Sequence, residues 1–243
     1  VTFQPSEFAK FALVVLLAVK LTANEQQLGS FLRGLLPPLL IAGCFAGMVY
    51  LQRDIGVPAV ILGTAVGMLF VAGARWSHLA AAGSVLLGLV AAAVLFVPHR
   101  VQRLLAFRDP WAYREDESFQ LIQAFSAFAE GGWYGRGLGA GEQKLGYLPA
   151  AETDFVFAVL AEELGLFGSL GVVLAFGVLT WSGLRVAQHA PDRFGQILGA
   201  GLTLLITVQA VVVLAVNTGL APTKGLPLPF VSAGGTALIA YLG

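Results

Sequence analysis

Residues 152–165 read ETDFVFAVLAEELG, and the apolar run that begins inside this stretch continues to residue 184. A transmembrane helix needs about 20 predominantly apolar residues, so residues 155–184 are long enough to cross a bilayer. The stretch places Asp154 where the apolar run begins and Glu162 and Glu163 further along it. Ionisable side chains are costly at membrane depth and are candidates for a functional site. The sequence therefore predicts a membrane helix with a functional carboxylate at one end.

The composition of the whole chain indicates a membrane protein. Apolar residues make up 57% and charged residues 12% of the 243 residues, against roughly 45–50% and about 25% in soluble domains. The chain is predicted to be an all-α, polytopic membrane helical bundle. Its apolar stretches predict about seven transmembrane helices, at roughly 6–23, 35–51, 55–73, 79–98, 155–184, 195–217 and 229–243.

Several classes of protein are excluded by the same counts. The formal net charge is zero, so no nucleic-acid partner is expected. The single cysteine, Cys44, excludes a disulfide framework, and the three histidines are isolated, so no metal motif is present. We expect one membrane domain over residues 1–243. Because the chain starts without methionine and ends inside an apolar stretch, we also expect it to be part of a longer protein.

Two kinds of connection alternate between the predicted helices. Short, plain linkers at about 24–34, 74–78 and 185–194 alternate with segments that hold the unusual residues. Those segments are residues 4–7, 52–56, 99–154 and 217–235. The plain linkers and adjoining helix ends carry five Lys or Arg residues and the short segments opposite carry three. The positive-inside rule then places the unusual segments on the outer face.

Two of the unusual segments predict particular structures. The 99–154 loop, between the fourth and fifth helices, is too long for an idle connection. It places Leu121, Phe125 and Phe128 on one face of a helix, which is either an interfacial helix or an ordinary packed one. In the 217–235 segment, three prolines prevent a regular helix up to Pro229. A re-entrant or cavity-lining loop is expected there.

Each candidate residue has a structural alternative. Asp154 could cap the helix that follows it, and Glu7 and Lys10 are spaced to pair on one helix face. The structural or cavity-lining set comprises Glu7, Lys10, Gln52, Asp54, Glu162 and Glu163. The glycine-rich stretch around Arg136 lacks the spacing of a nucleotide-binding loop, yet its backbone could let Arg136 or Lys144 approach an anion.

Four motifs occur in order along the chain. They are QPSEFAK at 4–10, GLGAGEQKLGYLP at 137–149, ETDFVFAVLAEELG at 152–165 and KGLPLPFVSAGG at 224–235. Together they resemble the shape, elongation, division and sporulation (SEDS) family of peptidoglycan glycosyltransferases, of the RodA and FtsW type. The resemblance extends over the whole chain and implies that about three further helices precede it.

The resemblance implies a function as well as a fold. Family members polymerise lipid II at the outer face of the cytoplasmic membrane and work with a class B penicillin-binding transpeptidase. Asp154 takes the family's catalytic place, while Ala150 and Glu152 stand where glutamate and histidine are usual. The expected substrate-binding residues are Lys144, Arg136, Lys224, Ser232 and Glu152.

Some alternatives remain open at this point. No cofactor is required by the sequence, and a divalent cation, Mg²⁺ or Mn²⁺, is compatible with the chemistry. A flippase for the same lipid-linked precursor would also use membrane carboxylates, and a noncatalytic scaffold for the transpeptidase would need none. The motifs do not distinguish roles in elongation, division and sporulation.

Overall fold

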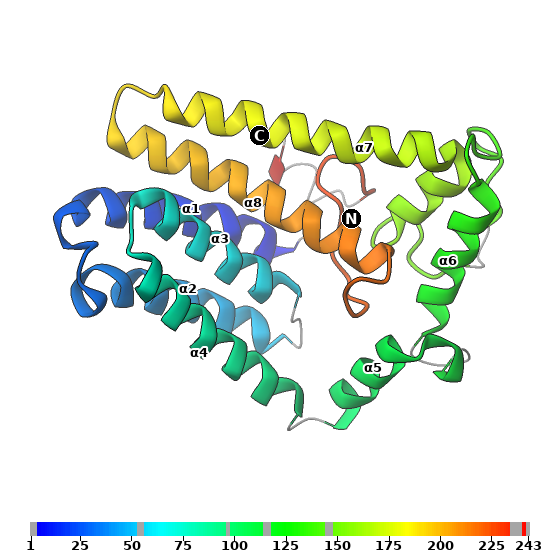
Figure 1. Ribbon diagram of the computed structural model, residues 1–243, viewed down its shortest axis with the longest axis horizontal. Helices are drawn as coiled ribbons and strands as arrows, with labels where there is room; N and C mark the ends of the chain where they lie inside the picture. Colours follow the sequence, from blue (N-terminus) through cyan, green and yellow to red (C-terminus); the bar gives the residue numbers. More distant parts are fainter. Residues whose placement is uncertain are drawn as a thin grey trace. The chain divides into compact units, whose positions relative to one another are not determined.

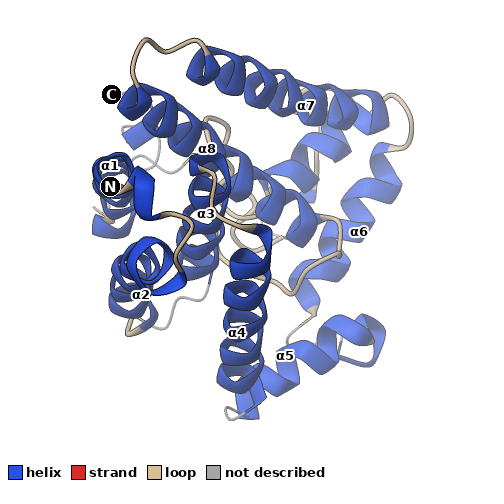
Figure 2. Ribbon diagram, turned by 60° about the vertical axis from the view of Figure 1, so that its left-hand side comes forward, coloured by secondary structure: helices blue, strands red, loops and turns tan. Residues whose placement is uncertain are grey.

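The regular elements of the protein are helices. The computed structural model describes residues 4–52, 56–95, 98–113, 118–143, 148–233 and 240–241, and no strand occurs among them (Figure 2). The prediction of an all-α membrane fold is confirmed. The chain forms two compact units, one from residues 1–90 and 177–209 and the other from 91–176 and 210–243. Helices α7 (Val156–Gln188) and α8 (Arg193–Asn217) contribute to both units. The single membrane domain expected over residues 1–243 stays a prediction.

The first unit is built around the N-terminal helices. It contains α1 (Pro5–Ala23), α2 (Leu36–Tyr50, preceded by a π-helical turn at Phe31–Leu35), α3 (Gly56–Ala72) and most of α4 (Trp76–Leu95). Helices α1, α2 and α3 pack against one another (Figure 1). A Cβ on Gly201 of α8 would lie 2.7 Å from Met68 and 2.8 Å from Val14. The helices of this unit therefore approach closely at small residues, as membrane helices often do.

Arg193 connects three helix ends of the first unit. Its Nε lies 3.0 Å from Glu25 Oε1, just after α1, and its Nη2 donates to the carbonyl of Ala72, at the end of α3. Arg193 itself begins α8. These contacts place the plain linkers after α1 and before α8 at the same end of the unit, in agreement with the predicted alternation of the loops.

The second unit contains the long predicted loop. Within it lie α5 (Pro98–Arg108), a 3₁₀ turn at Pro110–Tyr113 and α6 (Phe119–Gly131). Helix α6 confirms the helix predicted around Leu121, Phe125 and Phe128, and it buries Leu121. The unit is completed by the first part of α7, the end of α8 and the irregular segment 218–233.

The predicted spans agree with the helices except at two places. The first six predicted stretches coincide with α1, α2, α3, α4, α7 and α8. Among the described residues, three helices are long and apolar enough to cross a membrane: Phe31–Tyr50, Val156–Gln188 and Arg193–Asn217. A seventh span starting at residue 229 is wrong at its beginning, because residues 229–233 form turns; most of the remainder lies outside the described residues.

The second difference is a break inside α7. Gly165 has φ 68° and ψ −165°, which interrupts the helix and divides it into Val156–Leu164 and Leu166–Gln188. The uninterrupted helix predicted from 155 to 184 is therefore wrong at this residue. Only glycine adopts such a backbone conformation at little cost.

Candidate functional site

Asp154 lies in a tight turn immediately before α7. The carbonyl of Ala150 accepts the amides of Thr153, Asp154 and Phe155, at 3.0–3.2 Å. Ala150 itself has φ +56°, in the left-handed region that side chains disfavour. The Asp154 side chain is half-buried. The turn therefore fixes the backbone of Asp154 locally and leaves its carboxylate partly accessible.

The C-terminal part of the chain holds the same turn through three consecutive carbonyl groups. Each carbonyl of residues 152–154 accepts a hydrogen bond from the end of α8 or from the segment that follows it. The bonds join Ala233 N to Glu152 O (2.9 Å), Ser232 Oγ to Thr153 O (2.6 Å) and Asn217 Nδ2 to Asp154 O (2.9 Å). The turn is thus held at every residue from 152 to 154.

The segment after α8 also reaches the carboxylate of Asp154. A Cβ on Gly225 would lie 2.9 Å from Asp154 Oδ2, so the backbone at Gly225 packs directly against the carboxylate. Lys224, partly buried, precedes Gly225 in this segment. The irregular loop predicted from the three prolines is confirmed over the described residues 218–233, and it lies beside the candidate catalytic group.

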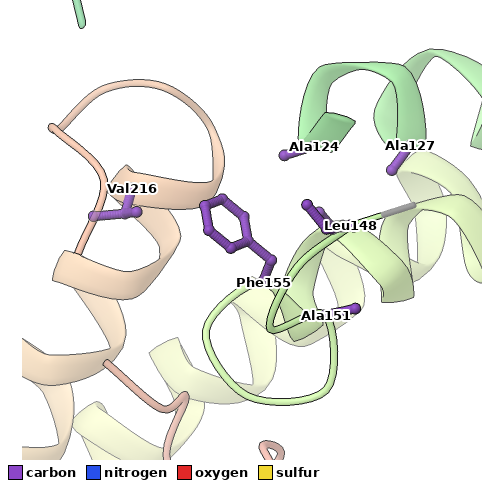
Figure 3. Close-up of a cluster of buried hydrophobic side chains, with 7 residues drawn as sticks. Ala124, Ala127, Leu148, Ala151, Phe155 and Val216 are labelled. Atoms are coloured by element: carbon purple, nitrogen blue, oxygen red, sulfur yellow. The ribbon is translucent and has the colours of Figure 1, made fainter. Parts of the chain in front are cut away.

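An apolar cluster anchors the turn from the other direction. Phe155, 1% exposed, packs among six small or apolar side chains of the second unit (Figure 3). They are Ala124, Ala127, Leu148, Ala151, Ala158 and Val216. Because α6, the 148–151 turn, α7 and α8 all contribute, the side chain next to Asp154 is fixed in the interior of the unit.

Arg136 lies among carboxylates. Its Nη1 is 3.0 Å from Glu130, 3.1 Å from Glu142 and 3.8 Å from Glu162. Glu162 is fully buried and also accepts the amides of Glu142 (2.7 Å) and Gln143 (3.3 Å). Three negative charges around one guanidinium repel an anionic ligand, which argues against the predicted contact of Arg136 with pyrophosphate.

The glycine-rich loop at residues 132–137 forms hydrogen bonds with the backbone on both sides of the break in α7. The amides of Arg136 and Gly137 donate to the carbonyls of Glu162 and Glu163, each at 3.0 Å. In return, the amides of Leu166 and Phe167 donate to Gly132 O (2.8 Å) and Trp133 O (3.3 Å). A Cβ on Gly135 would lie 2.1 Å from Glu163 O, so only glycine fits there. The loop therefore satisfies the backbone groups that the break releases, as membrane burial requires.

The predicted pair of Glu7 and Lys10 lies in the first unit. Lys10 Nζ is 2.9 Å from Glu7 Oε1, both side chains are buried, and Lys10 also donates to Gln209 Oε1. The predicted ion pair is therefore present. Its part in a reaction stays a prediction.

The remaining candidates are distributed as follows. Lys144 and Asp54 lie outside the described residues. Gln52 is exposed in the turn after α2, Glu152 is exposed beside Asp154, and Glu163 is buried. Within the described part of the chain, no group of three or more His, Cys, Asp or Glu side chains is placed to hold a metal ion.

Two side chains near Asp154 make hydrogen bonds that the sequence did not predict. Ser232 is buried, and its hydroxyl accepts the Leu228 amide (2.7 Å) while it donates to Thr153 O. This geometry supports a structural part for Ser232, and substrate binding by it stays a prediction. Asn217 was not among the candidates, although a polar residue that ends a long apolar helix is an available signal.

Comparisons with known proteins agree with the motifs. A family model described as "Cell cycle protein", named for FtsW, RodA and SpoVE, matches residues 1–243. A probable peptidoglycan glycosyltransferase FtsW of Geobacter sp. (strain M18) is 42% identical over 240 residues, which are 99% of this chain and 65% of that protein. Stage V sporulation protein E of Bacillus subtilis (strain 168) is 40% identical over 241 residues, 99% of this chain and 66% of that protein.

Solved structures have the same fold. A chain from a study of "structural coordination of polymerization and crosslinking by a peptidoglycan synthase complex" matches with a TM-score of 0.80 and 32% identity, covering 100% of this chain and 67% of that chain. The rod shape determining protein RodA of Thermus thermophilus matches with a TM-score of 0.66 and 28% identity, covering 100% and 62%. The chain spans just under two thirds of the curated relatives it matches. It is a membrane protein of the FtsW, RodA and SpoVE family, the SEDS family.

Proposed function

We propose that the protein is a peptidoglycan glycosyltransferase that polymerises lipid II, with Asp154 as its general base. The relative from Geobacter sp. (strain M18) is named a probable peptidoglycan glycosyltransferase. One observation of the structure supports the assignment most directly: three consecutive carbonyls around Asp154 are held by a distant part of the chain. A carboxylate whose backbone is fixed in this way is suited to a reaction that depends on precise placement.

The proposed reaction needs few protein groups. The acceptor's sugar hydroxyl attacks the anomeric carbon of the donor sugar, and the bond from that carbon to the pyrophosphate oxygen breaks. The Asp154 carboxylate takes the hydroxyl proton as the new glycosidic bond forms, and the lipid pyrophosphate leaves as an anion. A well-placed general base contributes about 100–10,000-fold to such a step. The leaving group is a stable anion and needs no strong acid.

A cation should balance the charge that develops on the pyrophosphate. Among the residues that the structure describes, Lys224 is the candidate for this cation. It adjoins Gly225, which packs against the Asp154 carboxylate. A divalent cation would supply the same electrostatic stabilisation. Since the described residues form no metal-binding group, we derive no step through a metal.

We further propose that the protein acts in the cytoplasmic membrane with Asp154 facing outward. The excess of cations in the plain linkers supports this orientation. We also propose a class B penicillin-binding transpeptidase as its partner. The similar chain of a complex that couples polymerisation and crosslinking supports a partner of this kind.

The test is polymerisation of lipid II by purified protein. Wild-type protein should make glycan strands, and Asp154→Asn should lower the rate about 100-fold or more while leaving Tm unchanged. Asp192→Asn is a matched control, because Asp192 is an exposed aspartate in a plain linker. Full activity of Asp154→Asn would refute the assignment of Asp154 as the general base. Translocation of labelled lipid II across liposomes by a wild-type protein that makes no glycan would instead favour a flippase.

A further inference from the structure

The side chain of Asn217 binds two backbone groups at the start of α7. In an uninterrupted helix, the carbonyl of Asp154 would accept the amide four residues later, that of Ala158. Here Asn217 Nδ2 donates to Asp154 O (2.9 Å) and Asn217 Oδ1 accepts from Ala158 N (3.2 Å). The Ala158 amide also donates to Phe155 O at 3.0 Å. The side-chain amide of Asn217 thus bridges two backbone groups that lie four residues apart.

Both N–H groups of the Asn217 amide are paired with backbone carbonyls, and its oxygen accepts one backbone amide. Its second N–H donates to Val213 O at 3.0 Å, within α8. Asn217 is 0% exposed. It is the last residue of α8, so it connects the end of that helix to the beginning of α7. A buried amide with all its donors paired fixes the geometry of the groups around it.

We infer that Asn217 is a positioning residue for Asp154. By binding the Asp154 carbonyl at 2.9 Å, it sets the direction in which the Asp154 side chain leaves the turn. Asn217 does not reach the substrate, because it is fully buried. The inference rests on the proposed function, in which the carboxylate of Asp154 accepts a proton.

Two substitutions separate positioning from ordinary capping of α7. Asn217→Asp keeps an oxygen to accept the Ala158 amide and favours the helix N-terminus electrostatically, but it cannot donate to Asp154 O. Asn217→Leu has a similar volume and loses both the bond to Asp154 O and the bond from Ala158 N. Thr218→Val is the control at the neighbouring position, because the Thr218 hydroxyl is exposed and bonds only within α8.

The experiment compares steady-state polymerisation of lipid II by the folded variants. Asn217→Asp and Asn217→Leu should each lower kcat about 10–100-fold with KM unchanged, because the lost bond acts on the placement of the base and not on substrate binding. Thr218→Val should match wild type. If Asn217→Asp retains wild-type kcat, Asn217 is only a helix cap and the inference is overturned.

Hydrogen exchange gives a second readout that does not depend on activity. Peptides covering residues 150–158 should exchange faster in Asn217→Leu than in wild type, and Asn217→Asp should be intermediate because it keeps the bond to Ala158. Unchanged exchange in Asn217→Leu would overturn the inference by itself. A wild-type protein that makes no glycan refutes the proposed function separately, and the exchange comparison then decides whether Asn217 holds the turn.

Discussion

Replacing Gly225 with alanine should move the carboxylate of Asp154 without destabilising the protein. The added Cβ would lie 2.9 Å from Asp154 Oδ2 and 3.6 Å from its Cγ, whereas ordinary contacts begin at 3.4 Å. The carboxylate must therefore retreat by about 0.5 Å, the difference between 3.4 and 2.9 Å. A misplacement of about 1 Å can cost about 100-fold in rate, so a loss of kcat of about tenfold is expected.

Although Gly225→Ala should lower kcat, it should leave the stability of the protein unchanged or raise it slightly. Gly225 is exposed and its φ lies outside the left-handed region, so alanine can adopt its conformation. The atom that must yield is the end of a side chain and not backbone. Gly→Ala at such a position stabilises by about 0.4–1 kcal/mol through the unfolded chain. Gly225→Ala should thus lose activity while its Tm stays equal or rises slightly.

The assay is polymerisation of lipid II together with thermal unfolding of the same preparations. Gly171→Ala provides the matched control, because a Cβ on Gly171 of α7 meets nothing within 4 Å. That variant should keep wild-type kcat. Wild-type kcat in Gly225→Ala would show that the position of the Asp154 carboxylate is not critical, and it would refute the reasoning that makes Asp154 the base.

Two further predictions concern stability. Ala150→Gly should raise the free energy of unfolding by about 0.5–1 kcal/mol. The substitution removes the left-handed strain at φ +56°, and that gain exceeds the entropic cost of ordering glycine. A lower Tm than wild type would contradict this prediction. Lys10→Met should cost about 3–5 kcal/mol, since it leaves the buried carboxylate of Glu7 without its cation. Thermal unfolding of the double variant Glu7→Gln, Lys10→Met should show that part of the lost stability is recovered. A double variant less stable than Lys10→Met would show that the unpaired Glu7 carboxylate does not cause the loss.

The helices were predictable because their signals are local. Length and apolar character identified α1, α2, α3, α4, α7 and α8, and the spacing of Leu121, Phe125 and Phe128 identified α6. The pair of Glu7 and Lys10 followed in the same way, from a separation of three residues on one helix.

The details of the site were not predictable because they depend on contacts between distant segments. Gly165 resembles the other glycines of an apolar helix, and its break forms only where the loop around Gly135 supplies replacement hydrogen bonds. Arg136 was expected to approach an anion, and its contacts with Glu130 and Glu162 become apparent only in the folded chain. Asn217 could be noticed as a polar residue at the end of an apolar helix, but the backbone groups that its side chain binds lie about 60 residues away and carry no sequence signal.

The start of α7 and its break at Gly165 are stabilised in a similar way. At the start, the side chain of Asn217 binds Asp154 O and Ala158 N. At the break, the glycine-rich loop binds the backbone of residues 162 and 166 and of residues 163 and 167. Each pair is four residues apart and would be joined directly in a regular helix. The intervening helix, Val156–Leu164, is therefore held at both ends by groups from other parts of the second unit. A short helix is only marginally stable alone, so these hydrogen bonds and the packing of Phe155 determine where it lies. Because Asp154 lies two residues before this helix, the position of its carboxylate depends on the whole unit and not on the turn alone.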